Sequence, residues 1–258
     1  MAAAGVLLLA ALCTVAPASA STGLSGHSTA AFDAKVSAYT REHPNDYTGL
    51  AKLVKSMGGT FTVSTSDTGP TTPEIATSVF KSYDGQRDAT PGTVSPMAFP
   101  SNAFVVSIAS SRAPGSTVAY VTGGWNWRDD FVGQGPPVDI AALRFSKACG
   151  SYQSYETATY RYDNVSTNLS TLRSSGVGGN GPIWNVADTV SGFMNYADHG
   201  YVGVHINIAG CGAMQSAFDY EGNKGGSVVS ASVGWGGLSV GYSNPGSILQ
   251  LSTVAVTI

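Results

Sequence analysis

The chain has 258 residues, a length that fits one domain, or one domain with a small appendage. Charged residues make up only 11% of it, against about 25% in an ordinary soluble domain, and the formal net charge is −3. These values exclude a dominant basic surface for nucleic acid or anionic lipid. The hydrophobic content of 43% is enough to build a core and argues against general disorder.

The N-terminus has the features of a secretory signal peptide. Residues 5–16 form a short apolar run, and Ala18-Ser19-Ala20 follows it as a small-residue cleavage site. The run is too short to span a bilayer, although no Lys or Arg precedes Lys35 and the usual basic segment is therefore missing. We expect residues 1–20 to be a signal peptide and the mature chain to be secreted and extracellular.

Cleavage after Ala20 removes Cys13 and leaves Cys149 and Cys211. Two thiols in an oxidising compartment usually pair, so we predict a disulfide between them. A bridge that closes about 60 residues stabilises a chain by about 4 kcal/mol in the chain-entropy model. Neither cysteine has a nearby Cys or His at zinc-binding spacing, and we therefore expect no metal centre at this pair.

Helices are expected first in the mature chain. Phe32, Val36 and Tyr39 recur at the spacing of one helix face, and Pro44 ends that helix. A second apolar stripe follows and stops at a pair of glycines. The pattern predicts that residues 21–59 form a helical hairpin that packs on a sheet.

Strands are expected in the second half. Residues 60–101 are rich in Ser, Thr, Gly and Pro, which is typical of surface loops. From residue 102 onward, short β-branched or aromatic segments are separated by turn residues. The predicted fold is mainly β, an antiparallel β-sandwich or barrel over residues 102–258 with a small N-terminal helical hairpin.

The C-terminal segment, residues 225–258, contains no charged residue. Apolar and hydroxyl side chains alternate on both sides of Gly236-Gly237, and Asn244-Pro245-Gly246 turns the chain again. This pattern predicts a three-stranded meander. Strands without charges favour edge-to-edge pairing, so the meander is a candidate contact with a second subunit, a polymer surface or a bilayer. The alternative is that its strands are central in a sheet and fully paired.

An aromatic cluster gives the first candidate binding site. Trp125 and Trp127 share one side of a predicted strand, and Asn126 and Asp130 lie beside them. Planar indoles stack on sugar rings while amides and carboxylates bond hydroxyl groups. These four residues are therefore predicted to bind a ligand. The alternative is that one indole belongs to the core and the other covers a sheet edge.

A second cluster points to catalysis. Asp198 and His199 precede His205, and the two histidines are six residues apart, an even interval, so their imidazoles share a face of a regular strand. Two imidazoles and a carboxylate serve as acid and base or bind a metal. We expect Asp219 and Glu221 to add a carboxylate to this cluster, because the Cys149–Cys211 bridge would hold their segment close to it. The alternative is that all five are ordinary polar residues of a loop and a strand.

Two further features concern calcium and glycosylation. Asp129-Asp130 and Asp139 supply the oxygen ligands that calcium prefers. The alternative is that these loop carboxylates are only solvated, and the sequence requires no cofactor.

Asn164 and Asn168 each begin an N-glycosylation acceptor sequence, which has meaning only in a eukaryotic source.

No Walker loop, nucleophile elbow, His-Glu-x-x-His or EF-hand sequence is present. The missing motifs favour a non-enzymatic protein, although they leave turnover undecided. We therefore expect a secreted binding or surface-interaction protein whose partner is a glycan, a cell-wall polymer or a cell surface. The alternatives are a secreted hydrolase built on the histidine cluster, and a self-associating or pore-forming β protein that pairs through residues 225–258.

Overall fold

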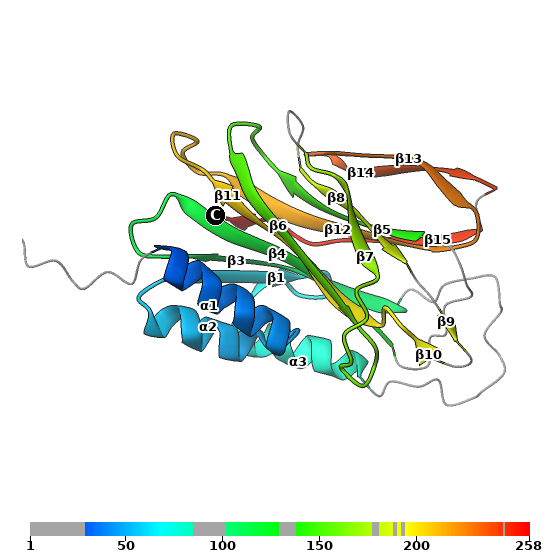
Figure 1. Ribbon diagram of the computed structural model, residues 1–258, viewed down its shortest axis with the longest axis horizontal. Coiled ribbons are helices and arrows are strands. Elements are labelled where there is room, and N and C mark those ends of the chain that lie inside the picture. Colours follow the sequence, from blue (N-terminus) through cyan, green and yellow to red (C-terminus); the bar gives the residue numbers. More distant parts are fainter. Residues whose placement is uncertain are drawn as a thin grey trace, which may run out of the picture.

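The structure is a computed structural model that describes residues 29–84, 102–128, 138–176, 181–187, 190–191, 194–244 and 246–258. The signal peptide expected at residues 1–20 lies outside these ranges. Two antiparallel sheets lie face to face, and helices and a hairpin cover their outer faces (Figure 1). The predicted class, mainly β with an N-terminal helical hairpin, is confirmed.

Sheet A is the helix-covered sheet. Its strand order is β2 (Gly69–Thr71), β1 (Thr60–Thr65), β3 (Phe104–Arg112), β4 (Val118–Trp127), β11 (His199–Asn207) and β6 (Ser151–Tyr160). The helices on its outer face are α1 (Thr29–Glu42), α2 (Tyr47–Ser56) and α3 (Pro73–Tyr83).

Sheet B lies against the other face of sheet A. Its order is β15 (Ser247–Ser252), β12 (Gln215–Lys224), β5 (Val138–Phe145), β8 (Ile183–Ala187) and β7 (Ser170–Ser174), and β16 (Val256–Thr257) also pairs with β12. Its outer face is covered by the hairpin of β13 (Ser227–Gly234) and β14 (Gly237–Ser243). Two short strands, β9 (Val190–Ser191) and β10 (Met194–Asn195), pair with each other.

The core follows from the two-residue period of the strands. In β3, Phe104, Val106 and Ile108 contact the cluster between the sheets, whereas Val105 and Ala109 face the helices. Sheet A is therefore apolar on both faces, which explains why its central strands read as continuous hydrophobic runs.

The helical hairpin forms because an apolar stripe on each helix meets sheet A. Phe32 and Val36 of α1 pack with Leu50 and Val54 of α2. Asp46 begins α2 as its N-cap, since its Oδ1 accepts a hydrogen bond from the Gly49 amide at 3.0 Å.

The expected loops at residues 60–101 are wrong for the first part of that range. β-Branched residues of Thr60–Thr65 pair with β3, and Pro73 starts α3 directly after its N-cap Thr72. Proline is favoured in the first turn of a helix, so this proline begins an element and does not indicate a loop. Residues 85–101 lie outside the described part of the chain.

The predicted three-stranded meander at residues 225–258 is also wrong. β13 and β14 form a hairpin as expected, but β15 leaves it and pairs with β12, opposite residues 219–224. The reason is hydrophobic, because Leu249 and Leu251 pack against the core between the sheets. The charge-free segment is thus divided between two layers.

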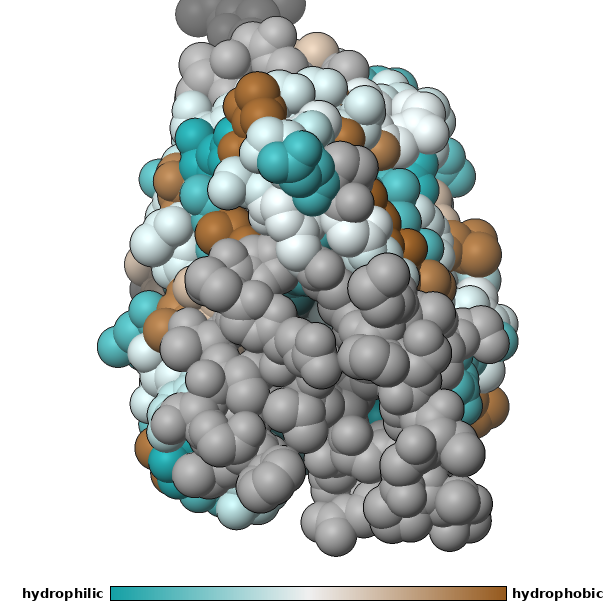
Figure 2. Space-filling model, turned by 90° about the vertical axis from the view of Figure 1, so that its right-hand side faces the viewer, coloured by the Kyte–Doolittle hydropathy of each residue, from teal (hydrophilic) through white to brown (hydrophobic). Residues whose placement is uncertain are grey.

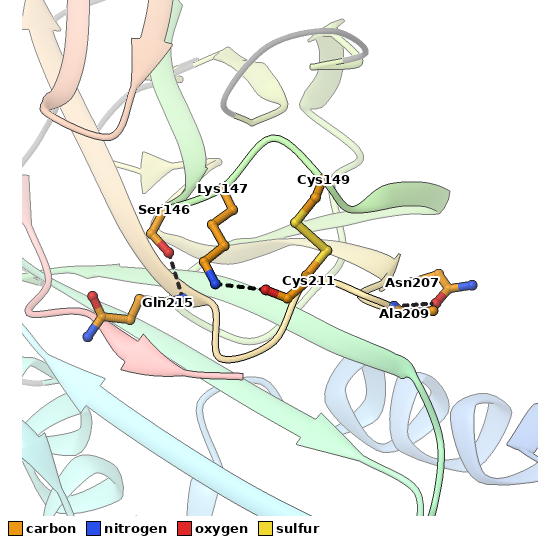
Figure 3. Close-up of a disulfide and its surroundings, with 7 residues drawn as sticks. All are labelled: Ser146, Lys147, Cys149, Asn207, Ala209, Cys211 and Gln215. Atoms are coloured by element: carbon orange, nitrogen blue, oxygen red, sulfur yellow. Dashed lines mark hydrogen bonds between the residues drawn. A yellow bond between two sulfur atoms is a disulfide. The ribbon is translucent and has the colours of Figure 1, made fainter.

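The predicted disulfide is confirmed. Cys149 and Cys211 are bonded, and their Cα atoms are 5.8 Å apart (Figure 3). Two hydrogen bonds join the same two loops: Lys147 Nζ donates to the Cys211 carbonyl at 2.7 Å, and the Gln215 amide donates to Ser146 Oγ at 2.9 Å. The bridge therefore ties the end of β5 to the segment between β11 and β12.

Candidate functional site

The two indoles of the predicted binding cluster are core residues. Trp125 and Trp127 are 0% and 1% exposed, and both contact Tyr220 of sheet B. Trp184 is equally buried. A ring enclosed between two sheets has no face for a ligand, so the predicted stacking surface of Trp125 and Trp127 is not formed. Asp130 lies outside the described residues.

Asn126 points the other way, because successive strand side chains alternate. It faces α3, where its Nδ2 donates to the Phe80 carbonyl at 2.9 Å and to Asp84 Oδ1 at 2.8 Å. Asn126 is 2% exposed, and its Oδ1 has no hydrogen-bond partner among the described residues. A buried carbonyl oxygen without a donor is costly, by about 1–3 kcal/mol in proteins.

Asn126 lines a cleft of about 190 Å³ at one end of the helix-covered face. The cleft lies where the C-terminal end of α3, the α1–α2 loop and the turn after β6 meet the ends of β4 and β11. The lining residues are Pro44, Asn45, Asp46, Phe80, Lys81, Asp84, Asn126, Tyr162, Asn164 and His199. Amides and carboxylates predominate over apolar side chains.

His199 forms one wall of this cleft at the first residue of β11. Its Nδ1 is hydrogen-bonded to Asp198 Oδ2 at 3.2 Å and its Nε2 to Asn164 Oδ1 at 3.0 Å. Its ring stacks on Tyr160, with centroids 5.3 Å apart. Three neighbours thus fix the orientation of this imidazole.

His205 lies on the same face of β11 but far from the cleft. Six residues of strand separate it from His199, or about 20 Å at 3.3 Å per residue. Its Nδ1 is hydrogen-bonded to Ser154 Oγ at 2.8 Å and lies 4.0 Å from Glu156 Oε1. The two imidazoles therefore do not meet in one site, and the expected catalytic cluster does not assemble.

Asp219 and Glu221 belong to a third place, under the β13–β14 hairpin. Asp219 Oδ2 lies 3.1 Å from Arg144 Nε, and Glu221 Oε1 accepts a hydrogen bond from Tyr242 at 2.5 Å. Burial raises the pKa of both carboxyls, although the Arg144 charge and the Tyr242 hydroxyl respectively oppose the rise. Neither carboxylate joins a histidine.

Asp139, one of the suggested calcium ligands, is buried and already serves the core. Its Oδ2 accepts from the Tyr220 hydroxyl at 2.7 Å and its Oδ1 from the Asn223 amide at 2.9 Å. Asp129 and Asp130 lie outside the described residues. Within the part of the chain that is described, no group of three or more His, Cys, Asp or Glu side chains is placed to hold a metal ion.

Charges of both signs line the cleft. Burial alone would raise the pKa of Asp46, but hydrogen bonds from Tyr39 and the Gly49 amide, together with the Lys81 charge, hold that pKa below its usual value. Asp84 lies at the end of α3 and binds Asn126. The cleft therefore presents the carboxylates of Asp46 and Asp84 beside the ammonium group of Lys81.

Tyr162 supplies an accessible aromatic ring at the cleft, because its side chain is 54% exposed. Sequence reasoning named Asn126 and His199 of this cleft but missed Tyr162, Lys81 and Asp84. Nothing in a single sequence places the α3 end beside the turn after β6, because that contact is made only in the folded chain.

No family model and no curated protein matches this chain. Among solved structures it is similar to the C-terminal domain of the Streptococcus agalactiae AgI/II polypeptide BspA, with 8% identity over 58% of each chain and a TM-score of 0.29. It thus spans less than two thirds of that domain.

Two other solved structures show a similar degree of likeness. One comes from work on pH-induced modulation of Streptococcus parasanguinis adhesion by Fap1 fimbriae, with 10% identity, 57% of this chain, 79% of that chain and a TM-score of 0.27. The other is the KRT10-binding region domain of the pneumococcal serine rich repeat protein PsrP, with 15% identity, 58% of this chain, 88% of that chain and a TM-score of 0.27.

On the face seen in Figure 2, the coloured residues show small, separate apolar groups among hydrophilic ones. Across the described ranges, no helix is both long and apolar enough to cross a membrane.

Proposed function

We propose that this protein is a secreted extracellular binding protein that holds a neutral, polyhydroxylated ligand, a glycan, in the cleft at Asn126. The observation that carries the proposal is the lining of the cleft, where the amides of Asn45 and Asn126 and the carboxylates of Asp46 and Asp84 surround one side of the space. Amides and carboxylates of this kind bond the hydroxyl groups of a neutral ligand and fix its orientation.

The other lining groups fit the same ligand. Asp46, Asp84 and Asn45 offer oxygens that accept from hydroxyl groups, and the exposed ring of Tyr162 offers an apolar face for a pyranose. Lys81 balances part of the carboxylate charge, which disfavours a strongly charged ligand of either sign.

The size of the cleft limits what it holds. Its volume of about 190 Å³ is smaller than the roughly 300–1,000 Å³ of sites for drug-sized ligands. We therefore expect it to bind one sugar unit of a longer chain, with the remaining units outside.

Binding is favoured over hydrolysis by the state of His199. Both of its ring nitrogens are hydrogen-bonded, to Asp198 and to Asn164, so the ring is held as a wall of the cleft. The secretion that we infer from residues 1–20 agrees with the Cys149–Cys211 bridge, since disulfides persist in oxidising compartments.

The experiment is retention on a panel of immobilised neutral polysaccharides, followed by calorimetry with the fragments that elute the protein. Tyr162→Ala and Asp84→Asn are expected to weaken retention at least tenfold, about 1.4 kcal/mol. Tyr162→Phe keeps the ring and is expected to bind nearly as wild type.

The control variant is Leu172→Ala, which alters an exposed side chain of β7 that does not line the cleft. Retention that Tyr162→Ala and Asp84→Asn leave unchanged would refute the cleft as the binding site. Release of reducing ends during incubation would show turnover and would replace binding by hydrolysis.

A further inference from the structure

The turn that follows β6 carries an acceptor sequence for N-linked glycosylation at the mouth of the cleft. Asn164-Val165-Ser166 lies at a tight turn, in which the backbone N–H of Asn164 donates to the Arg161 carbonyl at 2.8 Å. All three residues are exposed, and Asn164 has the left-handed φ of 62° that asparagine tolerates in turns. The acceptor side chain therefore stands on the protein surface.

The side-chain amide of Asn164 is oriented by His199. Its Oδ1 is hydrogen-bonded to His199 Nε2 at 3.0 Å. The Nδ2 atom lies on the other side of the planar amide group, and it is the atom to which an N-linked sugar attaches. Modification at Nδ2 retains Oδ1, so the contact with His199 survives it.

We propose that Asn164 carries an N-linked oligosaccharide and that this oligosaccharide covers the mouth of the cleft. In the attachment step, Asn164 Nδ2 bonds to the anomeric carbon of an oligosaccharide diphosphate donor. The bond from that carbon to the donor oxygen breaks, the diphosphate carrier leaves with the electron pair, and Nδ2 gives one proton to a base of the transferring enzyme.

The consequence is control over access to the cleft. Asn164 is itself a lining residue, so a sugar on it lies within reach of Tyr162 and Lys81. Its effect on ligand binding rests on the proposed function, whereas its attachment and its shielding of Lys81 do not.

The chain offers a matched control four residues away. Asn168 begins a second acceptor sequence, is exposed, and has a similar φ of 53°, but it does not line the cleft. A sugar on Asn168 is therefore expected to leave the cleft open.

The experiment uses the full chain secreted from a eukaryotic host that attaches N-linked sugars. Glycopeptide mass spectrometry measures occupancy at Asn164, and an amine-reactive reagent measures the accessibility of Lys81, with exposed Lys52 of α2 as the internal reference. Ser166→Ala removes the acceptor sequence but keeps the Asn164 amide, and Asn168→Gln is the control.

We expect occupancy at Asn164 and labelling of Lys81 several-fold faster in Ser166→Ala than in wild type, with Asn168→Gln unchanged. An unmodified Asn164, or equal Lys81 labelling in wild type and Ser166→Ala, overturns the proposal. Ligand binding by chain made without sugars tests the proposed function separately, so the two failures are distinguishable.

Discussion

The two outer faces of the sandwich are covered in different ways. The β13–β14 hairpin covers sheet B with an apolar cluster that includes Ile140, Ile183 and Leu238, and the buried carboxylates beneath it bind Arg144 and Tyr242. Helices cover sheet A with apolar clusters of their own, but the cover ends at a polar cleft.

The difference lies in the polar groups that each cover encloses. Under the hairpin, Asp219 and Glu221 each meet a partner from a neighbouring strand. Under the helices, Asn126 satisfies its Nδ2 with α3 but leaves Oδ1 without a donor among the described residues. Buried atoms without a hydrogen-bond partner among the described residues occur in both regions, Asp219 Oδ1 under the hairpin and Asn126 Oδ1 under the helices, so what distinguishes the helix-covered end is its open cleft lined by amides and carboxylates.

The largest expected effect comes from breaking the pair under the hairpin. Asp219→Ala leaves the Arg144 guanidinium largely buried without its carboxylate, and such a loss costs about 3–5 kcal/mol. Urea unfolding at neutral pH measures it through the free energy of unfolding.

The control is a double variant, Asp219→Leu with Arg144→Met, which removes both charges. It is expected to recover much of the loss, because apolar replacement of a buried ion pair is often neutral. Equal destabilisation by the single and the double variant would contradict the assignment of the cost to an unpaired charge.

A smaller effect is expected from pH. Burial raises the pKa of Glu221 above its ordinary value of 4.5. The stabilising contribution of this group is therefore fully present below pH 4.5 and is lost as the pH rises through the folded-state pKa. Glu221→Gln, which stays neutral, is expected to flatten that decline in unfolding free energy.

The measurement is a series of urea midpoints from about pH 4 to about pH 8 for wild type and variant. Tyr242→Phe, which keeps the Glu221 carboxyl but removes its hydroxyl donor, is the companion variant. A variant curve parallel to that of wild type would show that Glu221 does not titrate differently in the folded state.

The smallest expected effect is at the cleft. Tyr162→Ala removes an exposed ring and is expected to change the free energy of unfolding by less than about 0.5 kcal/mol, while retention on polysaccharide falls. Thermal unfolding measures the first quantity. A large loss of stability would mean that Tyr162 supports the fold, and the loss of retention would then not report on ligand contact.

Much of the fold was predictable because local patterns and the core agree. The apolar stripes at Phe32 and Leu50 predicted the helical hairpin, and the β-branched or aromatic runs after residue 102 predicted β3, β4, β6 and β11 of sheet A, but not β1 and β2. The errors lay where a local signal has two physical meanings. Pro73 follows the N-cap Thr72 and begins a helix although proline is also common in loops, whereas the pairing of the Leu249 strand with β12 is decided by tertiary packing.

The candidate site was predictable only in part. The sequence singled out the segment of Trp125 and Asn126, but it could not tell which face of β4 meets sheet B. Both indoles, of Trp125 and Trp127, are buried in the core between the sheets, whereas Asn126 on the opposite face of β4 lines the cleft. The even spacing of His199 and His205 placed them on one face, yet a strand is too extended for six residues to bring two rings together.

The disulfide lies beyond the end of β11 opposite to His199. The strand runs over nine residues from the cleft to Asn207, about 30 Å, and Cys211 follows in the next loop. A reducing medium would thus lower the resistance of the protein to heat while the side chains that line the distant cleft keep their geometry. Samples handled with thiol additives would lose heat stability before the proposed binding at the cleft is affected.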